Sequence, residues 1–262
     1  MSDYILEINN LSKYFGGLAA VSNCSLKVKK GSITGIIGPN GSGKTTLFNL
    51  IAGNLKSTSG SVIFDNENIT DVPSYELFSK GLLRTFQIAH EFSNLSVLEN
   101  LMMVPGNQSG ENLMTALLKP NLVAAEEKLV KEKAKEVVEF LNLSHLTNEL
   151  AGNLSGGQKK LLELGRTMMV DAKIVLLDEV GAGVNRTLLK DLGTAIEKLN
   201  KEKGYTFCMI EHDMDFIGRL CDPVIVMAEG SVLFEGTVAD AKKDEKVIES
   251  YLGRGSKLED TK

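Results

Sequence analysis

Several features that this 262-residue sequence lacks narrow the classes of protein to which it can belong. No apolar run approaches the ~18 residues that a membrane-spanning helix needs, so any work at a membrane would depend on a partner. The formal net charge is −5, so the chain lacks the basic footprint of a nucleic-acid-binding protein. The opening MSDYILEINN holds no basic segment followed by an apolar one, and we therefore expect no signal peptide.

Cysteine is also scarce. Cys24, Cys208 and Cys221 are odd in number and do not have the spacing of metal ligands. Such a set is typical of a protein from a reducing compartment such as the cytoplasm. Hydrophobic residues make up 43% of the chain and charged residues 24%, as in an ordinary globular protein whose length allows a substantial core.

The segment GPNGSGKTT fits G-x-x-x-x-G-K-[ST], with Gly38, Gly43, Lys44 and Thr45 at the fixed positions. SITGIIG before it is typical of a buried parallel strand, and KTTLFNLIAG after it predicts a helix that ends near Gly53. Strand, glycine loop and helix form the context of a phosphate-binding loop, in which backbone N–H groups surround an anion. We expect Lys44 to reach the β- and γ-phosphates of a nucleotide and the Thr45 hydroxyl to bind Mg²⁺.

Two acidic residues, Asp178 and Glu179, end the segment KIVLLDE. The four apolar residues before them predict a buried parallel strand beside the loop strand. Ligands bind at the carboxyl ends of the strands in open α/β sheets. Asp178 then suits the Mg²⁺ site, and Glu179 suits the polarisation of an attacking water.

The segment NLSGGQKK predicts the start of another helix, with Ser155 as its N-cap. Ser155, Gly156 and Gly157 also form a candidate anion site that is separate from the phosphate loop. The two anion sites in one chain indicate an ATP molecule held between two subunits.

With these motifs the chain resembles the ATP-binding-cassette (ABC) ATPase family over nearly its whole length. The Walker A loop, the Q-loop, the signature LSGGQ, Walker B and the switch histidine occur in the family's order. RTFQ supplies Gln87 as the Q-loop glutamine, and IEHD supplies His212 as the switch histidine. The resemblance implies ATP and Mg²⁺ as ligands and ATP hydrolysis as the activity.

The resemblance also implies a complete set of site residues. The catalytic residues would be Glu179, His212, Gln87 and Lys44. The metal site would use Thr45, Gln87 and Asp178. The nucleotide would contact Phe15, Gly38, Pro39, Asn40, Gly41, Ser42, Gly43, Lys44, Thr45 and Thr46, and, from the signature, Ser155, Gly156, Gly157 and Gln158.

Two aromatic residues in KYFGG compete for the role of adenine platform. Tyr14 and Phe15 point in opposite directions if the segment is extended. The family places the stacking ring just before a glycine, which favours Phe15, and we expect Tyr14 to be buried in the core. The chain departs from the family at Val180, where Pro is usual, and at Asn185, where the D-loop usually has Asp. These departures leave open how stiffly Glu179 is held and how two sites communicate.

The predicted fold class is α/β: a P-loop NTPase of the ABC type, with a mostly parallel core sheet, an N-terminal antiparallel subdomain and an inserted helical subdomain. DPVIVMAEGSVLFEGT reads as a hairpin around AEGS. An amphipathic helix is predicted from apolar positions at a 3.6-residue period, namely Leu122, Ala125, Leu129, Ala134, Val137 and Leu141. The single ABC domain would comprise the α/β core at 1–87 and 171–240, the helical subdomain at 88–170, and a C-terminal helix and polar tail at 241–262.

Within the family, GLLRTFQIAHEFSNLSVLENLMM and ESYLG are similar to segments of LivG-type ATPases of branched-chain amino acid importers. This similarity implies a second, different ATPase as partner, two permease subunits and a place on the cytoplasmic face of the inner membrane. It implies no direct contact with the solute. Urea importers, lipopolysaccharide exporters and soluble ABC proteins acting on DNA or ribosomes remain alternatives, whereas a GTPase is disfavoured because the chain has no N-K-x-D motif.

Overall fold

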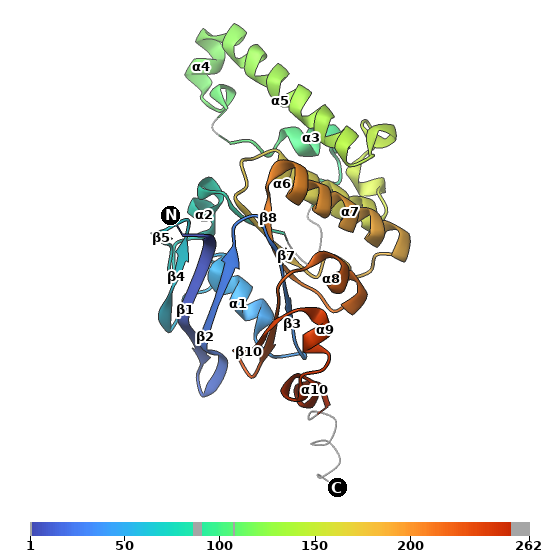
Figure 1. The fold of residues 1–262 in the computed structure, drawn as a ribbon. Helices are drawn as coiled ribbons and strands as arrows, with labels where there is room; N and C mark the ends of the chain where they lie inside the picture. Colours follow the sequence, from blue (N-terminus) through green and yellow to red (C-terminus); the bar gives the residue numbers. More distant parts are fainter. Residues whose placement is uncertain (1, 86–90, 107, 253–262) are drawn as a thin grey trace. The chain divides into compact units, whose positions relative to one another are not determined.

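A computed structural model describes residues 2–85, 91–106 and 108–252 (Figure 1). The chain forms two compact units. The first, here the sheet unit, comprises Met1–Arg84, Lys173–Gly181 and Ile196–Lys262. The second, here the helical unit, comprises Thr85–Ala172 and Ala182–Ala195.

The larger sheet of the sheet unit has six strands in the order β10-β9-β3-β8-β7-β6. Its strands are β3 (Ile33–Ile37), β6 (Leu82–Arg84), β7 (Ile174–Asp178), β8 (Thr206–Ile210), β9 (Val224–Ala228) and β10 (Ser231–Gly236). Every residue of β3, β7 and β8 is buried, as expected for strands covered on both faces. Only the β9–β10 pair is antiparallel, and it is the predicted hairpin.

The sheet order corrects one expectation. The strand that ends in Asp178 does not lie beside the loop strand, because β8 pairs in parallel with both β3 and β7 and lies between them. A short apolar run gives no information about which neighbour it pairs with. Since β3, β7 and β8 are parallel, their carboxyl ends still meet at one edge of the sheet.

The smaller sheet is antiparallel, with the order β2-β1-β4-β5. Its strands are β1 (Tyr4–Phe15), β2 (Leu18–Lys29), β4 (Ser59–Phe64) and β5 (Glu67–Asn68). Alternate residues from Cys24 to Val28 of β2 are buried, which is the pattern of a sheet with one face on the core. This sheet is the N-terminal antiparallel subdomain of the predicted fold class.

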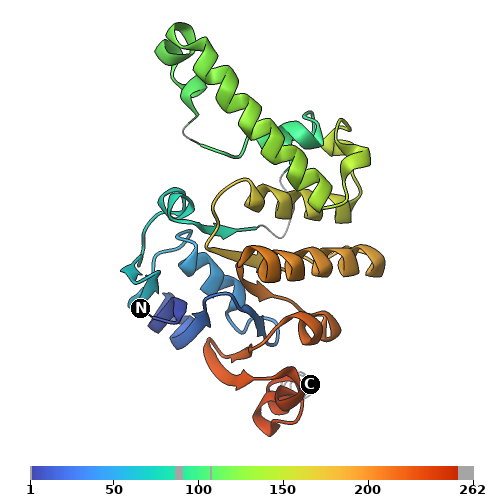
Figure 2. The same ribbon diagram turned by 45° about the horizontal axis from the view of Figure 1, so that its top comes forward.

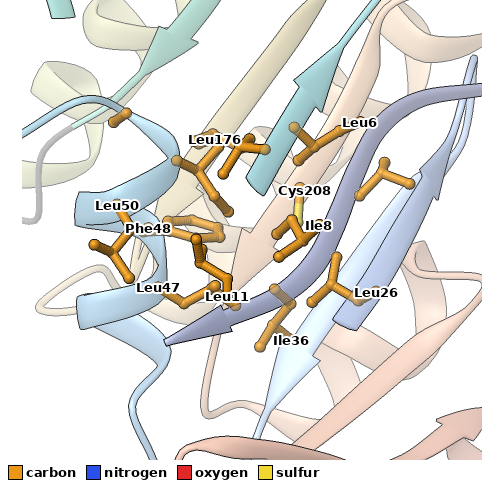
Figure 3. Packing of buried hydrophobic residues seen from close by; sticks show 14 of the residues in the cluster. Leu6, Ile8, Leu11, Leu26, Ile36, Leu47, Phe48, Leu50, Leu176 and Cys208 are labelled. Atoms are coloured by element: carbon orange, nitrogen blue, oxygen red, sulfur yellow. The ribbon is translucent and has the colours of Figure 1, made fainter. Parts of the chain in front are cut away.

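Helix α1 (Lys44–Ile51) joins the two sheets into one core. Its Leu47 and Phe48 side chains point toward Ile8 and Leu11 of β1 (Figure 3), and Leu50 belongs to the same buried cluster. Residues of β3, β7 and β8 belong to the same buried cluster. The helix ends where predicted, because Gly53 has a φ of +71° and a Cβ there would lie 2.1 Å from the Val72 carbonyl oxygen.

The remaining helices of the sheet unit are short. They are α2 (Ser74–Lys80), α8 (Met214–Leu220), α9 (Val238–Ala241) and α10 (Glu245–Leu252). Asp213 begins α8 by accepting hydrogen bonds from the Asp215 and Phe216 amides, and Thr237 caps α9. The last ten residues of the predicted C-terminal segment lie outside the described part of the chain.

The helical unit contains α3 (Val97–Met102), α4 (Leu113–Leu118), α5 (Pro120–Phe140) and α6 (Gly156–Met168). Short 3-10 turns occur at Ser109–Glu111, Ser144–Leu146 and Ala151–Asn153. Helix α7 (Arg186–Lys203) begins in this unit and ends in the sheet unit. In Figure 2, α5 is the long green helix, with α4 at its amino end. None of the helices that the structure describes is long and apolar enough to cross a bilayer.

The apolar face predicted for α5 is correct only in its second half. Ala134, Val137 and the following Leu141 are buried, and Val137 and Leu141 lie close to Gly165 of α6. Leu122 and Leu129 are exposed, at 43% and 72%. The amino-terminal half of α5 meets the 109–111 turn, where the Ser109 amide and hydroxyl donate to Glu126 and Gly110 lies close to Val123, and these contacts leave Leu122 and Leu129 in solvent.

Candidate active site

The phosphate loop joins β3 to α1, and two of its glycines are required by close backbone contacts. At Gly38 φ is +150°, and a Cβ would lie 2.1 Å from the Met227 carbonyl oxygen of β9. At Gly43 φ is +98°, and a Cβ would lie 2.4 Å from the Ala20 carbonyl oxygen of β2. A side chain at either position would push the loop off its neighbouring strands. The glycines therefore hold the loop in its curved form.

Lys44 lies in this loop and is only 5% exposed. Its Nζ donates to the carbonyl oxygens of Gly38, at 2.8 Å, and Pro39, at 3.0 Å. The first turn of α1 thus carries a cation at the amino end of a helix, an arrangement that suits phosphate. In the same loop Ser42 is buried, Pro39 and Thr46 are half-buried, and the exposed positions are Asn40, Gly41 and Thr45.

Asp178, at the end of β7, is 4% exposed and forms an ion pair that the sequence analysis missed. Its Oδ2 accepts from Arg84 Nη2 at 2.6 Å. Arg84 Nη1 donates to Asn49 Oδ1 of α1, also at 2.6 Å, and the guanidinium lies 6.0 Å from the Phe48 ring centroid. Arg84 stands just before TFQ in a segment already singled out for Gln87, so its position beside the motif was the available signal.

The residues present fit a magnesium ion that is held mainly by the nucleotide. Within the described residues there is no group of three or more His, Cys, Asp or Glu side chains that could hold a metal. Mg²⁺ usually keeps several waters and takes one or two protein oxygens together with substrate phosphates. The Asp178 carboxylate and the exposed Thr45 hydroxyl are oxygen donors of this kind, whereas Gln87 lies outside the described residues.

Glu179 and His212 lie together at the carboxyl edge of the sheet. Glu179 follows β7, and its amide donates to the Ile210 carbonyl of β8 at 2.9 Å. His212 follows β8, and its Nε2 lies 3.1 Å from Glu179 Oε1. Glu179 has a φ of +50°, in the left-handed region that non-glycine residues avoid. The sheet thus brings together two side chains that the sequence places in separate motifs.

A third acidic side chain, Glu211, was not predicted and lies beside this pair. It is 4% exposed, and its two carboxylate oxygens accept from the Gly181 amide, at 2.7 Å, and from the His212 amide, at 3.3 Å. Burial raises the pKa of the Glu211 carboxyl, the two amides oppose that effect, and the nearby Glu179 adds to it. IEHD contained this residue, but no local pattern marks it as buried.

The two departures from the family pattern have local partners. Val180, where the family usually has Pro, is 4% exposed and packs as an ordinary core residue. In the helical unit, Asn185 Oδ1 accepts from the Leu188 amide at 2.9 Å and so begins α7. An Asp side chain makes the same cap, which explains why Asn is accepted at this position.

In the helical unit, the signature begins α6. Ser155 and Gln158 form a capping box, in which Ser155 Oγ accepts from the Gln158 amide and Gln158 Oε1 accepts from the Ser155 amide. Gly157 has no room for a side chain, since a Cβ would lie 2.4 Å from Leu188 Cδ1. At Gly156 the nearest atom would be 3.9 Å away. Gly156 is therefore the signature glycine at which a side chain can be introduced without a clash.

The aromatic pair corrects a second expectation. Tyr14 is not in the core: it is 43% exposed, and Phe15 is 48% exposed. Both lie at the tip of the β1–β2 hairpin, where Phe15 pairs with Leu18 and where β1 has already run past its last partner in β4, Ser59. Both rings are therefore accessible to solvent, and Lys13 Nζ lies 5.2 Å from the Phe15 ring centroid.

Residues 21–182 match the family model described as ABC transporter. The chain belongs to the ABC transporter family. A LivG-type branched-chain amino acid transport ATP-binding protein of Archaeoglobus fulgidus is 43% identical over 249 residues, with 95% of each chain covered. The BraF protein of Pseudomonas aeruginosa is 37% identical, and the LivG protein of Escherichia coli is 34% identical, each over 97% of this chain and 99% of its own.

Solved ABC cassettes share the fold. A nucleotide-free ATP-binding cassette is 41% identical with a TM-score of 0.81, over 94% of this chain and 98% of its own. A dimeric cassette in a post-hydrolysis state with ADP and phosphate is 26% identical with a TM-score of 0.72, over 89% of this chain and 98% of its own. As a member of this ABC family, the chain binds ATP and hydrolyses it. The predicted P-loop NTPase fold is confirmed.

Proposed function

We propose that this ABC ATPase drives an importer of branched-chain amino acids by hydrolysing ATP with Glu179 as general base. The observation that carries the catalytic assignment is the Glu179–His212 contact of 3.1 Å at the sheet edge that also bears the phosphate loop. The names of the three relatives above support the solute class. Because ATPase subunits of such importers do not touch the solute, the solute itself is tested by uptake of labelled leucine into vesicles that hold the assembled transporter.

Each group of residues in the site then has a separate role at the nucleotide. The phosphate loop binds the phosphates through its backbone N–H groups, and Lys44 neutralises charge on the β- and γ-phosphates. Phe15 stacks on adenine. Glu179 accepts a proton from the attacking water, and His212 orients Glu179 beside the γ-phosphate. Thr45, Asp178 and Gln87 would hold Mg²⁺, which would supply charge neutralisation at the bound phosphates.

The signature completes an ATP site in a partner cassette. The first turn of α6 offers the amides of Gly156 and Gly157, whereas the Gln158 amide already bonds Ser155 within the capping box. The dimeric cassette among the structural relatives supports pairing between two cassettes. We infer that the physiological partner is a second, different ATPase, so that the isolated chain is mainly monomeric and pairs with itself weakly when ATP is bound.

Two permease subunits would hold the pair at the cytoplasmic face of the inner membrane. The helical unit supports a membrane partner, because four of the six residues of α4 are large apolar side chains in contact with solvent. These residues are Leu113, Met114, Leu117 and Leu118. An exposed apolar patch of this kind marks a binding surface more often than a free one.

Replacement of Glu179 by Gln tests the catalytic assignment. The side chain keeps its shape and its hydrogen bond to His212 but loses the proton-accepting carboxylate. We expect kcat to fall about 10²–10⁴-fold, the usual contribution of a positioned base, with ATP affinity retained. Phosphate release and calorimetric ATP binding measure the two effects.

Lys44→Ala is the contrasting variant, because it removes a charge that acts on the bound phosphates. It should weaken ATP binding itself. Hydrolysis at a near-normal rate by the Glu179→Gln variant would remove Glu179 from the mechanism, whatever the result at Lys44.

A further inference from the structure

The loop that carries Glu179 is tied to the loop that carries His212 by one side chain. Glu211 Oε1 accepts from the Gly181 amide, two residues after Glu179, and Glu211 Oε2 accepts from the His212 amide. The two distances are 2.7 Å and 3.3 Å. A single carboxylate thus spans the ends of β7 and β8, where the two proposed catalytic side chains leave the sheet.

A buried carboxylate is an unusual group to link two loops. Glu211 is 4% exposed, and within the described residues it forms no ion pair with Lys or Arg. A buried carboxylate without a cation is costly unless hydrogen bonds satisfy its oxygens. Within the described residues its hydrogen-bond partners are the Gly181 and His212 amides, so the conformation of the two loops and the burial of Glu211 depend on each other.

The Glu179 loop needs an external restraint. Glu179 has a φ of +50°, a conformation that persists in non-glycine residues only where the surroundings enforce it. Pro at position 180, usual in the family, would restrict the backbone by its ring, but this chain has Val180. The Glu179 amide is held by Ile210, and the next restraint along the loop is the Gly181–Glu211 bond.

We propose that Glu211 is a positioning residue for ATP hydrolysis, which acts by fixing the loops after β7 and β8 so that Glu179 and His212 stay in hydrogen-bonding register. The proposal rests on the catalytic roles proposed above for these two residues. Glu211 restrains only backbone amides of the two loops, so its effect falls on the chemical step. ATP binding depends on the phosphate loop and should not change.

The test compares kcat and KM for ATP in the full-length chain carrying Glu211→Ala or Glu211→Gln. Glu211→Ala removes both bonds, and we expect kcat to fall about 10- to 100-fold, as for other small misplacements of reacting groups. KM should change by no more than about twofold, because uniform binding is untouched. Gln keeps one acceptor oxygen and turns its NH₂ group toward the other amide, so Glu211→Gln should give a smaller fall and remains informative if the Ala variant does not fold.

Asn200→Ala is a matched control. Asn200 Nδ2 also makes two bonds from a side chain to the backbone, to the Gly31 and Tyr205 carbonyls, but at the amino end of β8. It should lower thermal stability to an extent comparable with Glu211→Ala and leave kcat near the wild-type value. Equal losses of kcat in the two variants would overturn the proposal, because the loss would then follow general destabilisation.

A double variant separates this proposal from the one on which it rests. If Glu211 acts through Glu179, then Glu211→Ala in a Glu179→Gln background should reduce the residual single-turnover rate by less than about twofold, since residues that act as a unit are not additive. A full 10-fold further loss would refute a role through Glu179. Normal hydrolysis by Glu179→Gln alone would instead refute the proposed base.

Discussion

The buried ion pair between Arg84 and Asp178 gives a stability prediction of large magnitude. The two side chains are 10% and 5% exposed, and Arg84 is the ion-pair partner of Asp178. Arg84→Met keeps much of the side-chain volume but leaves the Asp178 carboxylate buried without its cation. Removing one partner of a buried pair costs about 3–5 kcal/mol in the free energy of unfolding. For a chain of this size that is a fall in Tm of about 6–20 °C.

The ion pair between Lys173 and Asp65 in the same unit is the control. Its side chains are 51% and 37% exposed, so solvent screens the attraction. Lys173→Met should cost roughly 0–1 kcal/mol, or about 0–4 °C. Both variants and the wild type are melted without nucleotide or divalent metal, and chemical denaturation gives the free energies.

A second variant tests whether the cost comes from an uncompensated charge. Arg84→Met combined with Asp178→Leu removes both charges, and apolar replacement of a buried pair is often neutral or stabilising. The double variant should recover most of the lost stability, although it cannot hydrolyse ATP if Asp178 holds Mg²⁺. The reasoning fails if Arg84→Met destabilises the chain no more than Lys173→Met, or if the double variant is no more stable than Arg84→Met.

Two further predictions concern ATP. Phe15→Ala should weaken ATP binding by about 1–3 kcal/mol in calorimetry, the worth of one stacked base, and Tyr14→Ala should leave the melting temperature nearly unchanged because its ring is exposed. If only the Tyr14→Ala variant loses affinity for ATP, then Tyr14 and not Phe15 stacks on adenine. Gly156→Asp, where a side chain has room, should abolish ATP-dependent pairing of the Glu179→Gln chain in sedimentation by placing like charges together, with ATP binding by the monomer preserved. Unchanged pairing would exclude a signature that acts on the partner's nucleotide.

Features with a local physical cause could be predicted from the amino-acid sequence. The glycines of the phosphate loop, the apolar run of β3, the end of α1 at Gly53 and the β9–β10 hairpin were all predicted correctly. In each case the local residue pattern was enough to predict the conformation, although at Gly38 a distant strand also leaves no room for a side chain. The signature is another local feature, because the Ser155–Gln158 capping box spans only one helical turn. The order of the motifs along the chain indicated the ABC family, and the comparisons with known proteins confirmed that membership.

Tertiary structure alone decided how distant segments pair and what covers them. It placed β8 between β3 and β7, left Tyr14 exposed at a hairpin tip, and covered only the second half of α5. It also joined residues 182–195 to the helical unit. The hydrophobic pattern of a strand predicts that its faces are buried but does not identify the neighbouring strand. The apolar stripe of a helix likewise does not predict how much of its length is covered by other elements.

The same reason explains the two polar residues that were missed. Arg84 and Asp178 are 94 positions apart, and Glu211 and Gly181 are 30 apart, so neither contact has a local signature. Both follow from the parallel pairing of β6, β7 and β8, which aligns the carboxyl ends of three strands at one edge. The sequence determined which chemical groups stand at the ends of those strands. The sheet determined which of them touch, because hydrogen bonding between strands, and not distance along the chain, sets their register.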